Sequence, residues 1–175
     1  MTRTLTQPLT DQTARHNRHF QLIVDVHLLL LSDGDLLLGR RANTGYGDGA
    51  YEPPSGRLAE RETLVEAAVR VAAAQVGIEI DPAQVSLAHV LHDVSGQGRM
   101  AFFLTADGWA GDAGAVRRNP GLRNPGLRNP GTRSYNDFGW FPLTELPANM
   151  IDRARVAVRN FAAGARFSTY PAFGM

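Results

Sequence analysis

Short apolar runs alternate with polar or glycine-rich segments along most of the chain. The first run lies within Phe20–Leu31 and has too few residues for a long helix. Turn-forming residues at 32–35 separate it from a second apolar run, which ends at Arg40 and Arg41. This pattern predicts two strands that a tight turn connects.

The middle of the chain predicts a loop followed by a helix. Residues 43–49 are polar and rich in glycine, which is typical of a loop. Thr63–Val76 has no glycine or proline and consists mainly of helix-forming residues, so we predict a helix that ends at Gly77. Thr63 and Glu66 have the spacing of a capping box, in which each residue caps the backbone of the other.

The second half repeats this order of strands followed by a helix. Val85–Leu91 and Met100–Thr105 are short apolar runs with polar or glycine-rich flanks, and each suits a strand. Asn149–Ala163 has apolar residues at helical spacing with arginines between them, which predicts an amphipathic helix with one face on the core. Strands and helices in this order predict a layered α/β domain.

Three segments lie outside these elements. Residues 1–19 are polar and rich in threonine, so we predict a flexible leader before a domain at 20–165, and we predict a C-terminal tail at 166–175. Arg117–Arg133 is a five-residue repeat around Asn-Pro-Gly that contains five arginines and no acid. We predict an inserted surface loop there, because such a repeat cannot build a core. The alternative is that its arginines bind an acidic partner.

Composition and charge narrow the classes of protein that fit. The chain of 175 residues is 43% hydrophobic and 20% charged, which is enough for one globular domain with a continuous core. A formal net charge of +1 argues against a dedicated nucleic-acid binder, and the absence of cysteine excludes disulfides and cysteine-ligated zinc. No apolar stretch reaches the roughly 20 residues that a bilayer requires. We therefore predict a cytoplasmic protein without a membrane span.

One motif relates the predicted helix to a known family. Gly56, Glu62, Arg70 and Gly77–Ile78 have the intervals of the Nudix box. The stretches RRANTGYGDGAYEPPSG and FGWFPLTELPANM are also similar to the segments that precede and follow the box in that family. The chain therefore resembles a Nudix hydrolase of the nucleotide pyrophosphohydrolase type over about Phe20–Phe161. The resemblance implies a Nudix-like α/β/α sandwich with a mixed β-sheet, Mg²⁺-dependent cleavage of a nucleoside diphosphate linked to another group, and a homodimer.

The motif departs from the family pattern where the metal would bind. The family's three box glutamates correspond to Val71, Ala74 and Gln75. At about 100° per residue these positions share one helix face, where three carboxylates would converge to hold Mg²⁺. Two apolar side chains and one neutral amide cannot replace them. We therefore predict no metal or other cofactor and the loss of ordinary Nudix hydrolysis, with a phosphorylated small molecule still bound.

The residues leave two enzymatic alternatives open. In the first, Glu62 and Glu66 act as relocated ligands for Mg²⁺ or Mn²⁺ in an active pyrophosphohydrolase, whereas salt pairing along the helix favours structural support as their role. In the second, the pocket supports metal-free acid–base chemistry through Asp25, His27 or His92. Asp25 and His27 alternate onto one strand face, where they also suit a structural pair.

Charge and loop position select the candidates for ligand binding. Arg40 and Arg41 end a predicted strand before the glycine-rich loop, where guanidinium groups suit a phosphate or a carboxylate. Solvated charges at a strand end are the alternative for both. The full set of ligand-binding candidates is Arg40, Arg41, Asn43, Gly56 and Gln75.

Overall fold

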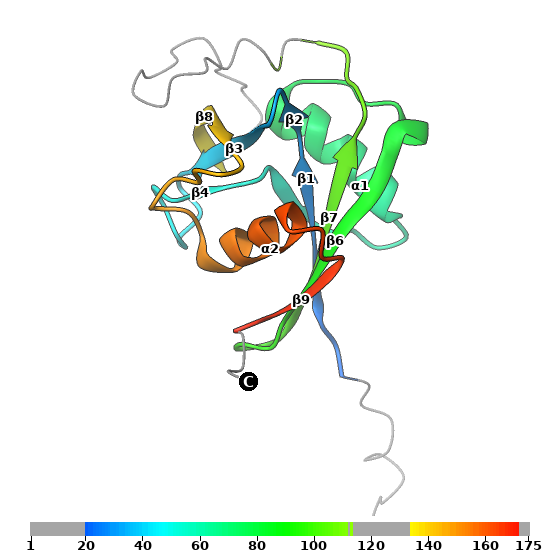
Figure 1. The fold of residues 1–175 in the computed structure, drawn as a ribbon. Helices are drawn as coiled ribbons and strands as arrows, with labels where there is room; N and C mark the ends of the chain where they lie inside the picture. Colours follow the sequence, from blue (N-terminus) through cyan, green and yellow to red (C-terminus); the bar gives the residue numbers. More distant parts are fainter. Residues whose placement is uncertain (1–19, 112, 114–133, 172–175) are drawn as a thin grey trace, which may run out of the picture.

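The computed structural model describes residues 20–111, 113 and 134–171. Their strands form two sheets, and helices pack on the larger of them (Figure 1). The predicted leader at 1–19 and the arginine-rich repeat at 117–133 lie outside the described residues. Within the described part of the chain, no helix is long and apolar enough to cross a membrane.

The larger sheet has five strands in the order β5-β1-β7-β6-β9. β1 is parallel to β7 and β6 is parallel to β9, whereas β5 is antiparallel to β1 and β6 is antiparallel to β7. The predicted mixed sheet is therefore confirmed. Its strands span Ile23–Leu29 (β1), Ser55–Arg57 (β5), Val85–Asp93 (β6), Arg99–Ala106 (β7) and Phe167–Tyr170 (β9).

The smaller sheet contains the predicted tight turn. Asp33 and Gly34 both have positive φ angles, of 52° and 85°, as a two-residue hairpin turn between right-twisted strands requires. β3 follows this turn and pairs with β2, β4 and β8. The strands span Leu31–Ser32 (β2), Asp35–Arg41 (β3), Tyr51–Glu52 (β4) and Tyr135–Pro142 (β8).

The helix that carries the box follows the prediction at both ends. α1 spans Leu64–Val71, and Thr63 and Glu66 form the predicted capping box at its start. The helix then widens into a π-helical turn, η2 (Ala72–Val76), in which the backbone bonds reach one residue further than in an α-helix. Gly77 ends it with a φ of 77°, in the left-handed region that glycine adopts readily.

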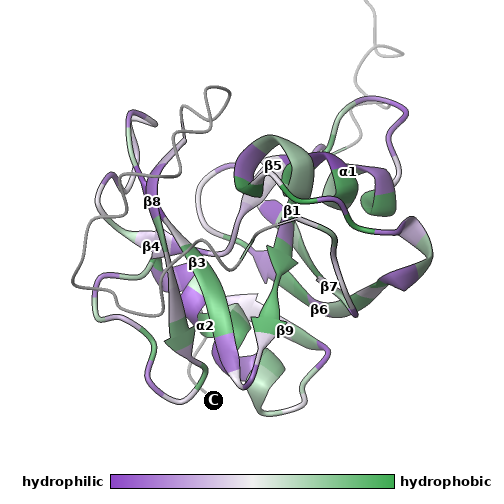
Figure 2. Cartoon of the chain, turned by 90° about the horizontal axis from the view of Figure 1, so that it is seen from above, coloured by the Kyte–Doolittle hydropathy of each residue, from purple (hydrophilic) through white to green (hydrophobic). Residues whose placement is uncertain are grey.

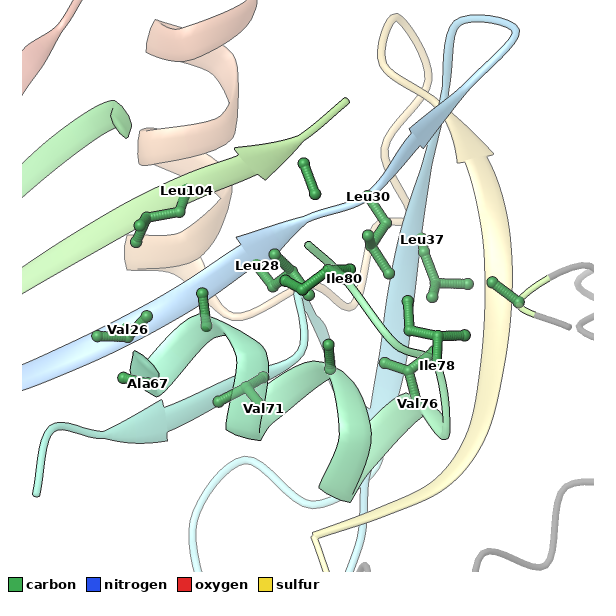
Figure 3. Packing of buried hydrophobic residues seen from close by; sticks show 14 of the residues in the cluster. Val26, Leu28, Leu30, Leu37, Ala67, Val71, Val76, Ile78, Ile80 and Leu104 are labelled. Carbon is green, nitrogen blue, oxygen red and sulfur yellow. The ribbon is translucent and has the colours of Figure 1, made fainter. Parts of the chain in front are cut away.

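Apolar side chains pack on both faces of the larger sheet, because neighbouring residues of a strand point to opposite faces. Val26 and Leu28 of β1 belong to the same buried cluster as Val71 of α1 (Figure 3). Phe103 of β7 packs on the other side with α2, which spans Asp152–Ala162. The predicted α/β/α arrangement is thus confirmed. Coloured by hydropathy, β1 and β3 are hydrophobic along much of their length (Figure 2).

The C-terminal segment corrects one predicted boundary. The sequence predicts a tail at 166–175, but Phe167–Tyr170 form β9 and extend the larger sheet beside β6. The buried His89 of β6 contacts this segment through both ring nitrogens: Nδ1 lies 2.8 Å from the Ala165 carbonyl oxygen and Nε2 lies 2.7 Å from Ser168 Oγ. Four residues of mixed polarity carry too little periodicity to predict such a strand.

Candidate functional site

A cavity of about 660 Å³ is lined by side chains from distant parts of the sequence. They come from β1, the end of β3, the glycine-rich loop at 43–49, the β4–β5 segment, the β6–β7 connection and the starts of β8 and α2. Both sheets and one helix therefore contribute to it. Five of the residues that the sequence selected lie in its wall: Asp25, His27, Arg41, Asn43 and Gly56.

Glu52 is the most buried acid of this wall, with 1% of its surface exposed. Its Oε1 accepts hydrogen bonds from the Arg41 guanidinium, from the Tyr135 hydroxyl at 2.9 Å and from Ser55 Oγ at 3.4 Å. Burial, and secondly the Glu52 charge, raise the pKa of Tyr135, which keeps its hydroxyl a neutral donor. The buried ion pair is therefore part of a connected polar network at the cavity floor.

Asp25 and His27 both face the cavity, as their alternation along β1 requires. Asp25 Oδ2 accepts a hydrogen bond from Arg99 Nη1 at 2.7 Å. The His27 ring is 3% exposed and stacks on Phe103, with the ring centroids 4.5 Å apart. Its Nδ1 has no hydrogen-bond partner among the described residues.

His27 is a neutral imidazole in this setting. Burial lowers its pKa below the ordinary value of 6.5, and the charges of Glu52 and Asp25 oppose the shift only in part. A neutral ring has one nitrogen that donates and one that accepts. His27 therefore lines the cavity without adding charge to it.

Arg41 holds the glycine-rich loop beside the cavity. Its Nε donates to the Tyr46 carbonyl oxygen at 2.9 Å and its Nη2 donates to Thr44 Oγ1 at 3.0 Å. Thr44 in turn donates to Asp48 Oδ1 at 2.6 Å, and the bonds from Thr44 lower the pKa of Asp48. The loop places the Tyr46 ring beside two guanidinium groups, at 5.7 Å from Arg41 and 5.2 Å from Arg153.

The three positions that correspond to the glutamates of the Nudix box have different surroundings from one another. Val71 is 1% exposed and belongs to the core, whereas Ala74 is exposed to solvent. Gln75 contacts the backbone of Ser55 through both ends of its carboxamide. Mg²⁺ requires hard oxygen ligands, commonly carboxylates, and these side chains do not fit it. Within the described residues, no group of three or more histidines, cysteines or acids is placed to hold a metal.

The two acids proposed as relocated ligands lie at the start of α1 and do not line the cavity. Glu62 accepts two hydrogen bonds from Arg70, at 2.6 and 2.7 Å, and one from the Ala59 amide at 2.9 Å. Glu66 accepts bonds from the amide and the hydroxyl of Thr63, each at 2.8 Å. Both carboxylates are therefore engaged in structural contacts at the helix start.

Arg40 and His92 lie outside the cavity wall. Arg40 donates from Nε to the Gly49 carbonyl oxygen at 3.4 Å, and His92 sits in the sheet between Met100 of β7 and Thr169 of β9. Sequence reasoning left several charged or polar residues of the wall unselected. Among them are Glu52, Arg57, Arg99, Tyr135 and Arg153.

Comparisons with known proteins agree with this fold. A family model described as NUDIX domain matches residues 20–161. The MutT NUDIX hydrolase from Burkholderia pseudomallei superposes with a TM-score of 0.63 at 21% identity, over 79% of this chain and 97% of that one. The MutT protein from Methanosarcina mazei Go1 superposes with a TM-score of 0.63 at 18% identity, over 81% and 94%. Among curated proteins, no sequence matches. At these identities the structural likeness concerns the fold.

Proposed function

The chain belongs to the Nudix family, and from that premise we propose that it binds a phosphorylated small molecule without metal-dependent hydrolysis. The ligand class is a nucleoside diphosphate joined to another group, or a related phosphorylated compound. The observation that carries this proposal is the composition of the box face. It presents a buried Val71, an exposed Ala74 and a Gln75 whose amide already bonds the backbone.

The charges of the cavity wall support an anionic ligand. Four arginines stand against three acids, Asp25, Glu52 and Asp93, in the wall. Two of the arginines pair with Asp25 and Glu52. Arg57 and Arg153 form no ion pair with any described residue. Their guanidinium groups suit phosphate oxygens, which accept two parallel hydrogen bonds from one arginine.

A second candidate function rests on His27. Its ring lines the cavity, its Nδ1 has no hydrogen-bond partner among the described residues, and the lowered pKa leaves the ring unprotonated near neutral pH, as a general base requires. Asp25 and Glu52 would stabilise the imidazolium that then forms. The site would in that case support acid–base chemistry on the bound ligand through its own side chains.

Calorimetry with ADP-ribose, a nucleoside diphosphate sugar and the four dNTPs tests the first proposal. Titrations are run with Mg²⁺ and with a chelator, and the same mixtures are assayed for product. We expect at least one compound to bind with equal affinity in both conditions and without turnover. Arg153→Gln should weaken that binding about tenfold or more, because it removes a charged hydrogen bond.

Matched controls separate the alternatives. Arg159→Gln removes an exposed arginine from the same helix outside the cavity wall, so it should leave the affinity unchanged. Turnover that requires Mg²⁺ or Mn²⁺ and disappears with Glu62→Gln would replace the proposal with a relocated metal site. Turnover in the chelator that disappears with His27→Phe would establish the acid–base candidate.

A further inference from the structure

The side chain of Gln75 forms a closed pair of hydrogen bonds with one backbone residue. Its Oε1 accepts from the Ser55 amide at 3.0 Å, and its Nε2 donates to the Ser55 carbonyl oxygen. The opposite orientation of the carboxamide would set N–H against N–H and oxygen against oxygen. Only the orientation found here satisfies both backbone groups, so the contact is specific to an amide.

Two neighbouring contacts extend this pairing along β5. Arg70 Nη2 donates to the Arg57 carbonyl oxygen at 2.9 Å. Val71 packs so close to Gly56 that a Cβ atom on that glycine would lie 3.1 Å from Val71 Cγ2. The face of α1 and η2 that carries the box positions therefore holds the whole of β5, residues 55–57.

We propose that Gln75 is a positioning residue that does the work of a bridging cation between the box helix and β5. A glutamate at position 75 would turn its second carboxylate oxygen toward the Ser55 carbonyl oxygen. Those two acceptors share no proton, and a divalent cation between them would relieve their repulsion. The carboxamide supplies its own N–H at that point, so the helix and β5 stay joined without a cation.

The clamp formed by Gln75 and Ser55 bears on the ligand site because all three residues of β5 line the cavity. It deepens the proposed function, since it explains how a box helix without carboxylates keeps the cavity wall in place. The clamp itself is tested through unfolding and needs no ligand. A failure of the clamp is therefore distinguishable from a failure of the ligand proposal.

Thermal unfolding of the full chain tests the clamp, in a chelator and in excess Mg²⁺ or Mn²⁺. Gln75→Glu should lower Tm by about 3–9 °C in the chelator and recover at least half of that loss with either cation. Gln75→Ala should lower Tm in both conditions alike. The unchanged protein should not respond to the cation. Ala73→Glu, which adds a carboxylate at an exposed position of the same turn, is the matched control and should not respond either.

The pH dependence of Tm is a second test of the clamp, because a side chain that only fills space at position 75 would not change it. In the Gln75→Glu variant, protonation of the introduced carboxyl restores a donor for the Ser55 carbonyl oxygen. The Tm of this variant in chelator should therefore approach that of the unchanged protein as the pH falls. Gln75→Ala should show no such approach. Hydrogen exchange at the Ser55 amide should be faster in Gln75→Ala than in the unchanged protein.

Three results would overturn the clamp. The first is an unchanged protein whose Tm drops in the chelator. The second is a Gln75→Glu variant that keeps the full Tm in the chelator at neutral pH. The third is unaltered exchange at the Ser55 amide in Gln75→Ala. A Gln75→Glu variant that folds only with the cation supports the proposal.

Discussion

Arg70 donates two hydrogen bonds to the carboxylate of Glu62, from Nε to Oε1 at 2.6 Å and from Nη2 to Oε2 at 2.7 Å. The same carboxylate accepts the Ala59 amide. The bonds from Arg70, followed by that amide, lower the pKa of Glu62 to about 2. These two residues, whose spacing indicated the box, therefore connect the segment before α1 to the helix.

Glu62→Gln should destabilise the protein at neutral pH by about 0.5–1 kcal/mol, because the 44% exposure of the Arg70 side chain leaves much of the pair screened by solvent. Because folding lowers the pKa of Glu62, the ionised carboxylate stabilises the folded protein at pH values above its unfolded pKa of 4.5. This stabilisation is lost as the pH falls from 4.5 toward 2. Urea unfolding at pH 7, 4 and 3 should therefore show a shrinking difference between the two proteins. Glu60→Gln alters a highly exposed neighbour and should change little at any pH.

Glu52→Gln should lower the free energy of unfolding by about 3–5 kcal/mol, because the mostly buried Arg41 guanidinium then has no anionic partner. The midpoint of urea unfolding should fall while the slope stays constant. Adding Arg41→Met to Glu52→Gln should recover part of the loss, because no unpaired charge then remains. An equal or larger loss of stability in the double variant would show that the unpaired Arg41 charge does not cause the destabilisation in Glu52→Gln. Arg61→Gln, in an exposed pair, should change stability by less than about 0.5 kcal/mol.

Because His27 is buried, we expect the free energy of unfolding to fall as the pH is lowered. Its pKa is depressed in the folded state, so below the ordinary value of 6.5 the unfolded chain binds more protons and is favoured. His27→Phe keeps the stack on Phe103 and should flatten the loss of stability between pH 7.5 and pH 5. His92→Gln, on β6 and outside the cavity wall, should retain the slope of the unchanged protein. An identical slope in His27→Phe would assign the pH dependence to other groups.

Local patterns of the sequence predicted most of the fold. Thr63, Glu66 and Gly77 predicted the limits of the helix because capping and the left-handed terminus depend on residues close in the chain. The π-helical form of its last turn was not predictable from Ala72–Val76, which suits an ordinary helix equally well. β9 was missed because its place depends on pairing with β6, far away in the sequence.

The candidate site was predicted only where the signal was local. Asp25 and His27 were found because polar residues in an apolar strand are conspicuous. Glu52 and Tyr135 were missed, since a buried carboxylate and its hydroxyl donor lie 83 positions apart and carry no spacing signal. Gln75 was selected from its place in the box, yet its partner at Ser55 emerged only from the packing of the helix on β5.

The close approach of β5 to α1 gives the most stringent test of this packing. Gly56→Ala should destabilise the protein by about 1–3 kcal/mol, because the new Cβ would lie 3.1 Å from Val71 Cγ2 and 3.4 Å from Arg70 Nη1. Val71→Ala removes the first of these contacts. The double variant should therefore lose less unfolding free energy than the two single variants together, by at least about 0.5 kcal/mol. Val158→Ala, in the core on the other face, should combine with Gly56→Ala additively. Additivity of Gly56→Ala with Val71→Ala, measured by urea unfolding, would mean that the two side chains do not meet.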